Sequence, residues 1–411
     1  MMRAPKSFRL HIGIFGRRNT GKSSLLNALT QQNVSIVSEI AGTTTDPVEK
    51  PMELLPLGPV LFIDTAGIDD EGDLGGKRVA KTMQVFERTD LGIIVTNFSD
   101  WGNYELKLIE EFNNRSIPFI LVFNKIDLFP EKNIITARAD EMKIKYTYTS
   151  ATEGSGFINL KQLILQAAPP DYINRPSILA DLVGEGEAAI LVVPIDKEAP
   201  KGRLILPQVQ SIRDLLDNNS FCLVVKEREL TEALKRLKTP PKLVVTDSQA
   251  FAKVAADTPP EIPLTSFSIL FARFQGDLIE MVKGAMAIDA LKPGDKILIA
   301  EACTHHPIEE DIGTVKIPNW LATYVGGELN IDYMRGNDFP DDITQYKLII
   351  HCGACMWNRR AMLSRILKAR QAGVPITNYG LTIAWSLGIF ERALEPFPAA
   401  LEVFNRYRLP V

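Results

Sequence analysis

Short apolar runs alternate with amphipathic stretches along the first 172 residues of the chain. The runs at 10–15, 60–63, 119–123 and 145–148 have the length of strands, and apolar residues recur at helical spacing between them. This alternation predicts an α/β domain with a doubly wound, mostly parallel sheet. Ligands of such sheets bind at the carboxyl ends of the strands, so the residues that follow each run are the first candidates for a site.

The alternation resumes after each of two proline-rich stretches, at 169–176 and 258–263. Proline clusters of this kind separate folded units. We therefore predict three consecutive α/β domains, at residues 1–172, 173–262 and 263–411. The expected strands of the last two are 189–194, 221–226, 242–246, 296–301, 328–334, 346–351 and 374–377, and the clearest helix is 356–372.

The first apolar run leads into the pattern G-x-x-x-x-G-K-S, which ends at Ser23. A glycine loop between a strand and a helix binds phosphate, because backbone N–H groups and the helix start face the anion. We expect Lys22 to reach the β- and γ-phosphates and Ser23 to hold Mg²⁺. A simple glycine turn is the alternative interpretation. The predicted nucleotide-binding residues here are Gly16, Asn19, Thr20, Gly21, Lys22, Ser23 and Ser24.

Three later motifs, each at the end of an apolar run, indicate that the nucleotide is GTP. Asp64 would hold Mg²⁺ through water, and the N–H of Gly67 would face the γ-phosphate. In Asn124-Lys125-Ile126-Asp127 the aspartate would accept two hydrogen bonds from guanine, which adenine cannot donate. A backbone N–H at Ser150-Ala151 would meet guanine O6. Four motifs in this order predict a GTPase.

The segment between Ser23 and Asp64 contains Ala41-Gly42-Thr43-Thr44-Thr45-Asp46, which suits a mobile switch loop. We expect Thr44 to complete the Mg²⁺ shell. Ile68 follows Gly67, where many GTPases place a glutamine that orients the attacking water. An isoleucine cannot do this, so slow hydrolysis is expected.

The composition and charge of the chain limit the kinds of partner that it is expected to bind. The 411 residues carry a net charge of −4 and no long Lys/Arg run, which argues against a large nucleic-acid surface. No apolar run approaches the roughly 18 residues of a membrane span. The basic stretch 1–10 leads directly into the first expected strand, so we expect no signal peptide, no membrane and a cytoplasmic location. Four cysteines in such a chain indicate metal or redox chemistry rather than disulfides.

Three of these cysteines lie at the ends of two expected strands of the last domain. One cluster follows strand 296–301 and the other follows 346–350, and parallel strands end at the same edge of a sheet. A helix expected to start near Met356 would lower the pKa of the thiols. The residues alone fit either a Zn²⁺ site or an iron–sulfur cluster with one labile position. The candidate ligands are Cys303, Cys352 and Cys355, with His305 and His351 for a fourth position or for the surrounding hydrogen-bonding shell.

The nucleotide motifs resemble those of the potassium-activated GTPases of the TrmE/Era type. The resemblance rests on Gly-Arg-x-Asn-x-Gly-Lys-Ser-Ser-Leu-Leu-Asn and on Ala-Gly-Thr-Thr-x-Asp. In that group the matching asparagine ligates K⁺, which supplies positive charge to the reaction. The resemblance implies this role for Asn19, and the alternative is that Asn19 only tolerates the turn.

Such a GTPase domain joined to C-x-H…H-C-x-x-C resembles the HydF family of FeFe-hydrogenase maturation GTPases over the whole chain. The resemblance implies a GTPase domain, a central dimerisation domain and a domain whose three cysteines hold a 4Fe-4S cluster. It implies a homodimer that uses GTP, Mg²⁺ and K⁺. Such a protein would receive a transient diiron precursor from the radical-SAM maturases HydE and HydG and deliver it to the apo-hydrogenase HydA.

Two other functions remain open from the residues alone. One is an Era/TrmE-like GTPase in RNA modification or ribosome assembly, with a zinc module; the acidic balance and the lack of a basic, aromatic-rich surface argue against it. The other is a small-molecule redox enzyme, for which the chain offers no further catalytic constellation or flavin or nicotinamide motif.

Overall fold

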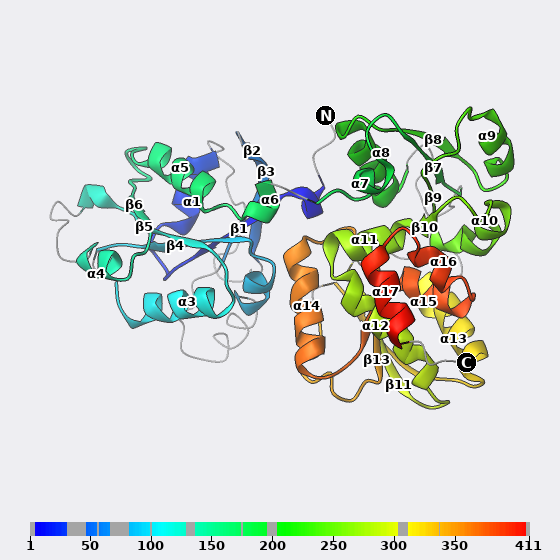
Figure 1. Ribbon diagram of the computed structural model, residues 1–411. Helices are drawn as coiled ribbons and strands as arrows, with labels where there is room; N and C mark the ends of the chain where they lie inside the picture. Colours follow the sequence, from blue (N-terminus) through cyan, green and yellow to red (C-terminus); the bar gives the residue numbers. More distant parts are fainter. Residues whose placement is uncertain are drawn as a thin grey trace. The chain divides into compact units, whose positions relative to one another are not determined.

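The computed structural model describes ten stretches of the chain, drawn in colour in Figure 1. The chain divides into two compact units, residues 1–175 and 176–411, and each is described by itself. The described stretches are 5–30, 47–55, 57–65, 82–98, 101–128, 136–173, 176–194, 204–302, 311–336 and 338–407.

The first unit contains a six-stranded sheet in the order β2-β3-β1-β4-β5-β6. All neighbouring strands run parallel except β2, which pairs antiparallel with β3. The predicted doubly wound, mostly parallel sheet is thus confirmed. The strands are β1 (Leu10–Phe15), β2 (Val48–Leu54), β3 (Gly58–Asp64), β4 (Leu91–Thr96), β5 (Phe119–Phe123) and β6 (Tyr146–Tyr148).

Helices cover both faces of this sheet, with α1 and α5 on one side and α3 on the other (Figure 1). Ile12 and Ile14 of β1 pack with the α1 and α5 side, whereas Phe15 packs with Phe112 of α3. The alternation of side chains along a strand therefore gives β1 two buried faces. The helices are α1 (Lys22–Thr30), α3 (Asn103–Asn114), α4 (Thr136–Glu141), α5 (Phe157–Ala167) and α6 (Pro170–Ile173), with short 3₁₀ helices at Lys6–Phe8 and Ile126–Leu128.

The second unit contains two four-stranded sheets, the first in the order β10-β9-β7-β8. Its strands run parallel, and β10 pairs with β9 through Leu264 beside Val244. Strand β10 lies beyond the predicted domain boundary at residue 262, so this sheet continues past that boundary. The strands are β7 (Ala188–Val192), β8 (Phe221–Val225), β9 (Leu243–Thr246) and β10 (Leu264–Ser266).

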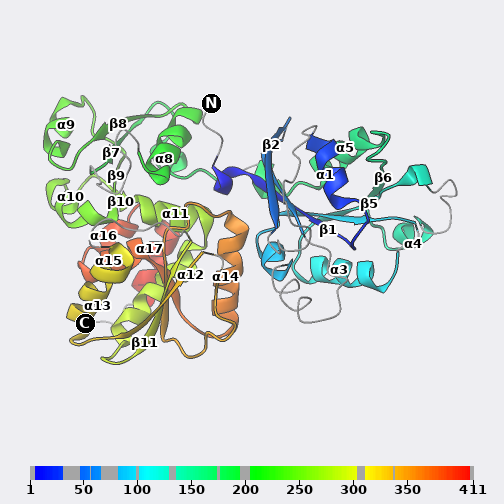
Figure 2. The same ribbon diagram turned by 180° about the vertical axis from the view of Figure 1, so that it is seen from behind.

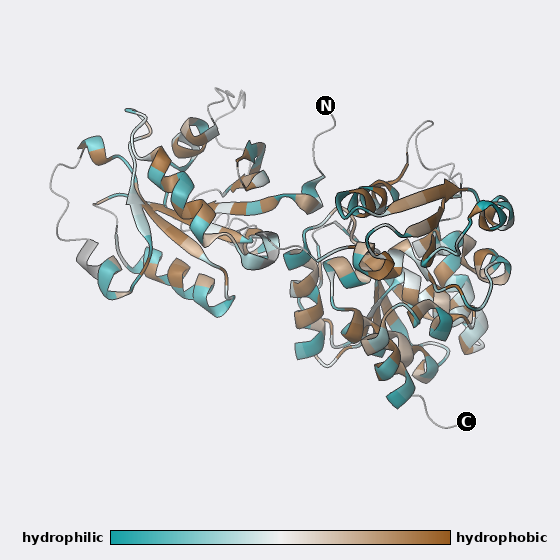
Figure 3. Ribbon diagram, turned by 45° about the horizontal axis from the view of Figure 1, so that its top comes forward, coloured by the Kyte–Doolittle hydropathy of each residue, from teal (hydrophilic) through white to brown (hydrophobic). Residues whose placement is uncertain are grey.

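The other sheet has the order β12-β11-β13-β14, again with parallel neighbours (Figure 2). Apolar residues of β11 and β13 pack against α13 and α15 in one buried cluster. Figure 3 marks the hydrophobic residues of the chain in brown. All four strands were expected from the sequence, within about two residues at most ends. They are β11 (Lys296–Glu301), β12 (Asn330–Arg335), β13 (Leu348–His351) and β14 (Ile376–Asn378).

The helix expected at 356–372 begins later, at Arg359. Asn358 precedes it, and its side-chain oxygen accepts a hydrogen bond from the N–H of Ala361, so the first turn is capped at this point. Among the helices that the structure describes, none is long and apolar enough to cross a bilayer. The helices of this unit are α7 (Ala180–Val183), α8 (Leu206–Asp217), α9 (Leu230–Arg236), α10 (Phe251–Asp257), α11 (Phe267–Gln275), α12 (Leu278–Met286), α13 (Ile317–Val325), α14 (Arg359–Gln371), α15 (Tyr379–Ser386), α16 (Phe390–Leu394) and α17 (Pro398–Tyr407).

Candidate functional site

The glycine loop between β1 and α1 is held tightly against the neighbouring strand ends. Gly16 has φ 145°, and a Cβ there would lie 2.1 Å from the carbonyl oxygen of Val95. At Gly21, with φ 88°, a Cβ would lie 2.4 Å from Nδ2 of Asn124. Only glycine fits both places, so the loop can bring its backbone N–H groups close to a ligand.

The lysine and serine of the loop make hydrogen bonds within the candidate site. The Lys22 ammonium donates to the carbonyl oxygens of Gly16 and Arg17, at 2.7 and 2.6 Å. The Ser23 hydroxyl donates to Oδ2 of Asp64 at 2.6 Å, so two predicted Mg²⁺ ligands lie in contact. This contact joins α1 to the end of β3.

Asp64 is buried, and its Oδ1 atom has no hydrogen-bond partner among the described residues. Burial raises the pKa of this carboxyl, and the Ser23 hydroxyl and the Lys22 charge oppose that effect. A buried carboxylate oxygen beside a hydroxyl is a suitable donor pair for Mg²⁺, a hard cation that prefers oxygen. The residues present therefore fit the predicted metal.

The motifs expected to bind guanine are joined by side-chain hydrogen bonds. Asn124 donates through Nδ2 to the carbonyl oxygen of Thr20 at 3.0 Å and accepts through Oδ1 from the Thr149 hydroxyl at 3.1 Å. Asp127 accepts from the Ser150 hydroxyl at 2.7 Å. These hydrogen bonds connect the glycine loop to the ends of β5 and β6.

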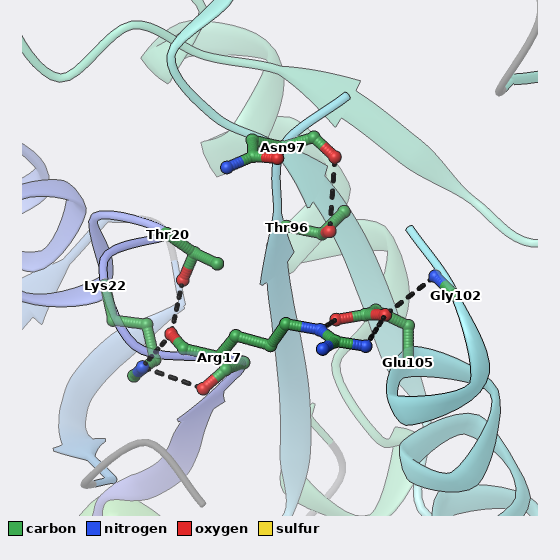
Figure 4. A network of polar contacts seen from close by, with 8 residues as sticks. Arg17, Thr20, Lys22, Thr96, Asn97, Gly102 and Glu105 are labelled. Carbon is green, nitrogen blue, oxygen red and sulfur yellow. Dashed lines mark hydrogen bonds and ion pairs between the residues drawn. The ribbon is translucent and has the colours of Figure 1, made fainter. Parts of the chain in front are cut away.

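An ion pair that was not predicted from the sequence connects the glycine loop to α3 (Figure 4). Arg17 donates through Nε and Nη2 to the two carboxylate oxygens of Glu105, at 3.0 and 3.4 Å. Glu105 is fully buried and also accepts from the N–H of Gly102 at 2.9 Å. Glutamate at the third position of a helix signals a cap, but nothing in the sequence indicates its arginine partner.

Several predicted residues lie outside the described part of the chain. For the nucleotide site these are Thr44 and Gly67, and for the cysteine site they are Cys303 and His305. Their predicted roles remain predictions.

The ends of β11 and β13 lie side by side, as the sequence predicted. Ala300 pairs with His351 in the sheet, and the N–H of Ala302 donates to Sγ of Cys352 at 3.1 Å. Ala302 is the residue immediately before Cys303. The chain therefore brings the segment leading into Cys303 against the sulfur of Cys352.

The prediction that the pKa of the thiols is lowered is wrong for Cys352. Burial raises the pKa of this thiol, and the N–H groups of Ala302 and Ala354 only partly oppose the effect. Because α14 begins at Arg359, its first turn lies further along the chain than the sequence suggested.

His351 is fully buried, and both of its ring nitrogens have partners. Nδ1 lies 2.9 Å from the carbonyl oxygen of Cys352, and Nε2 lies 2.9 Å from Nη1 of Arg365 on α14. Burial, followed by the charge of Arg365, lowers the pKa of His351 to about 3. Arg365 is a further residue that the sequence analysis did not identify.

The chemistry of these donors fits a thiolate-bound metal centre. Cys352 and Cys355 stand on one turn, where Ala354 has φ 50° and backbone N–H groups face the Cys352 sulfur. Sulfur ligands with N–H donors around them are typical of iron–sulfur sites. Among the described residues, no group of three His, Cys, Asp or Glu could hold a metal ion, and the predicted third cysteine lies outside them.

Comparison with protein-family models gives three matches. Residues 11–125 match the 50S ribosome-binding GTPase family, residues 178–276 the hydrogen maturase F dimerization domain, and residues 279–396 the hydrogen maturase F tetramerization domain. The N-terminal domain is therefore a GTPase domain, and the second unit carries oligomerisation domains.

Individual relatives match only part of this chain. The tRNA modification GTPase MnmE of Legionella pneumophila (strain Corby) is 38% identical over 160 residues, covering 38% of this chain and 34% of the relative. GTPase Der of Kosmotoga olearia is 32% identical over 209 residues, or 47% of each protein. The G domain of the T. maritima FeoB iron transporter is 23% identical, with a TM-score of 0.32 over 39% of this chain and 98% of that domain. The chain spans between a third and a half of the length of these two curated relatives.

Proposed function

The chain belongs to the hydrogen maturase F family, and from this premise we propose that it is a GTP-hydrolysing scaffold for the assembly of the FeFe-hydrogenase cofactor. It binds a 4Fe-4S cluster and carries a diiron precursor to apo-hydrogenase. The observation that carries the proposal is the hydrogen bond from Ala302 to Sγ of Cys352, which brings the two cysteine-bearing strand ends together.

Three cysteines hold the cluster in this proposal: Cys303, Cys352 and Cys355. When bound, a 4Fe-4S cluster held by these three cysteines would supply one iron with an exchangeable position. The chain's own part is to orient the thiolates and to donate hydrogen bonds to sulfur, as Ala302 does at Cys352. His305 remains a candidate for the fourth position.

The GTPase domain supplies a nucleotide-dependent switch. Lys22 binds the β- and γ-phosphates, and Ser23, Asp64 and Thr44 hold Mg²⁺. Asn19 holds K⁺ near the phosphates, where the ion supplies positive charge, and the isoleucine at position 68 keeps hydrolysis slow. Asn124, Lys125 and Asp127, with Ser150 and Ala151, select guanine. Slow hydrolysis suits the release of a partner better than continuous mechanical work.

The partners are a second copy of the chain, the radical-SAM maturases HydE and HydG, and the hydrogenase HydA. An exposed edge supports the first of these. Strand β8 ends the sheet, and Phe221 and Val224 are 53% and 41% exposed. An apolar edge strand with open backbone groups pairs readily with another strand, and β8 lies within the region that matches the dimerization domain.

The test is anaerobic reconstitution with iron and sulfide, followed by EPR after dithionite reduction. We expect a 4Fe-4S signal in the wild type that Cys303→Ala loses. Cys222→Ala is the matched control, because Cys222 stands on β8 and not on the β11–β13 edge; it should keep the signal.

A sample without a cluster signal that holds one tightly bound Zn²⁺ would contradict the scaffold. That result would favour the second candidate, an Era/TrmE-like GTPase in RNA modification or ribosome assembly with a zinc module. The 38% identity with MnmE over 160 residues is the observation that supports this candidate.

A further inference from the structure

A buried arginine lies next to the cysteine site and is fixed from several directions. Arg365 donates through Nη1 to Nε2 of His351 at 2.9 Å, and through Nη2 to the carbonyl oxygens of Gly336 and Asp338 at 2.9 and 3.0 Å. Its guanidinium carbon lies 4.1 Å from the ring centroid of Trp357 and 4.6 Å from that of Phe339. These contacts connect α14 to the segment after β12 and to the turn after β13.

The hydrogen bonds assign distinct roles to the two nitrogens of His351. A guanidinium has only donors, so Nε2 accepts from Arg365. A carbonyl oxygen only accepts, so Nδ1 carries the proton and donates to the oxygen of Cys352. His351 is therefore a neutral imidazole. One of its nitrogens is hydrogen-bonded to Arg365 and the other to the peptide group of Cys352.

The peptide group of Cys352 begins the turn that carries both cysteines. Its N–H donates to Ala300 at 2.9 Å, its carbonyl oxygen accepts from His351, and its sulfur accepts from Ala302. The first two bonds fix the backbone, and the third fixes the sulfur. A change at Arg365 removes its hydrogen bond to the His351 ring, and so the support of the second of these bonds, without replacing a cysteine.

We propose that Arg365 is a positioning residue of the cysteine site: through the ring of His351 it fixes the turn that carries Cys352 and Cys355, and it places a permanent positive charge beside the thiolates. This inference rests on the proposed function for the identity of the metal group, but the hydrogen-bond relay exists in the metal-free chain. His351 acts in this relay through both of its nitrogens. Groups that surround metal ligands in this way typically change metal affinity by about 10–100-fold when removed.

The first experiment uses the metal-free full chain with ¹⁵N-labelled histidine. The chain has four histidines, and the His351 resonances are identified by their loss in His351→Gln. We expect the Nδ1–H tautomer for His351 in the wild type and its loss in Arg365→Gln. Arg370→Gln is the matched control, because Arg370 is exposed on the same helix and its replacement removes the same charge.

A wild-type His351 that is an imidazolium or carries its proton on Nε2 would overturn the relay, and this measurement does not depend on the folding of Arg365→Gln. An unchanged His351 signal in Arg365→Gln would overturn it too. If Arg365→Gln does not fold, Arg365→Lys replaces it, because lysine keeps the charge but cannot donate to three acceptors from one plane. In that case, an unchanged His351 signal in Arg365→Lys would overturn the relay.

The second experiment measures how well reconstituted chains keep their iron against a chelator. We expect Arg365→Gln to hold iron about 10-fold more weakly than the wild type, with Arg370→Gln unchanged. His351→Gln should retain more iron than His351→Ala, because the glutamine amide oxygen can accept the Arg365 hydrogen bond. Equal retention in Arg365→Gln and Arg370→Gln would contradict the positioning role. A wild type that takes up no cluster would instead refute the proposed function, while the histidine spectra still decide the relay.

Discussion

At the scale of single residues, the nucleotide site contains a carboxylate, Asp64, whose charged form is unfavourable until a cation binds. Asp64 is a buried carboxylate with one oxygen on the Ser23 hydroxyl and the other without a partner among the described residues. Burial disfavours its charged form, so its pKa is raised. A bound cation would reverse that preference, which makes Asp64 sensitive to both metal and pH.

We therefore expect Asp64→Asn to stabilise the metal-free chain at neutral pH. The folded pKa of Asp64 is raised, so the wild type loses stability as pH rises through that pKa, whereas asparagine does not titrate. The free-energy difference between variant and wild type should shrink as pH falls toward the ordinary aspartate range, measured by urea unfolding without Mg²⁺. The same variant should lose about tenfold or more in Mg²⁺-dependent GTP affinity, since a contact with a charged group contributes about 1.5–3 kcal/mol. A pH-independent difference would contradict this account.

Asn19 offers a clean test of the potassium site. Its φ is 60°, a conformation that glycine also adopts without strain. Asn19→Gly thus removes the side chain while keeping the loop, and we expect GTP hydrolysis that no longer differs between K⁺ and Na⁺ buffers. Binding of GDP should stay near the wild-type level and serves as the control. Persistent K⁺ stimulation in Asn19→Gly would assign the ion to another ligand.

At the scale of elements, the glycine loop depends on α3 as well as on its own helix. The Arg17–Glu105 pair and the Gly102 cap bond share one buried carboxylate (Figure 4). A buried acceptor that serves two donors fixes the start of α3 and the loop together. We therefore expect a shift of α3 to move the glycine loop of the nucleotide site.

Replacing Glu105 by alanine should lower the free energy of unfolding by about 2–4 kcal/mol, because it removes a helix cap and one partner of a partly buried ion pair. It should also weaken GTP binding, since Arg17 loses its anchor. Glu110→Ala, on the exposed side of the same helix, is the control and should change stability by less than about 0.5 kcal/mol. Urea unfolding and nucleotide titration measure both effects. Equal behaviour of the two variants would show that α3 does not support the loop.

At the scale of the whole molecule, an apolar strand edge is the surface on which we expect chains to associate. The chain carries regions that match a dimerization and a tetramerization domain. Strand β8 has exposed apolar side chains and stands at the edge of its sheet. Pairing of this edge with a second copy would cover both the side chains and the unpaired backbone groups.

Val224→Lys should therefore reduce the oligomer to a smaller species, because a charge on a buried edge is unfavourable. Light scattering at micromolar concentration measures the mass. Leu55→Lys is the control, since Leu55 is 80% exposed and lies in the first unit. An unchanged mass for Val224→Lys, or wild-type chains that are monomeric, would remove the β8 interface.

Most of the strands and the nucleotide motifs could be predicted from the sequence, because each depends on neighbours within a few residues. The apolar runs at β1, β5 and β11 and the loop glycines predict their own backbone conformation. The same logic placed the two cysteine-bearing strand ends at one edge, since parallel strands of one sheet end together. Strands β2, β4 and β10 were not predicted. The assignment of β2 and β10 depends on which distant strand pairs with them.

The contacts and pKa shifts of groups that depend on distant elements could be found only from the tertiary structure. Arg17 and Glu105 are 88 positions apart, and Arg365 reaches His351 from a different element. The raised pKa of Cys352, opposite to the sequence expectation, results from burial by the surrounding chain. Local patterns encode backbone conformation, whereas desolvation and charge contacts arise only when separate elements pack together.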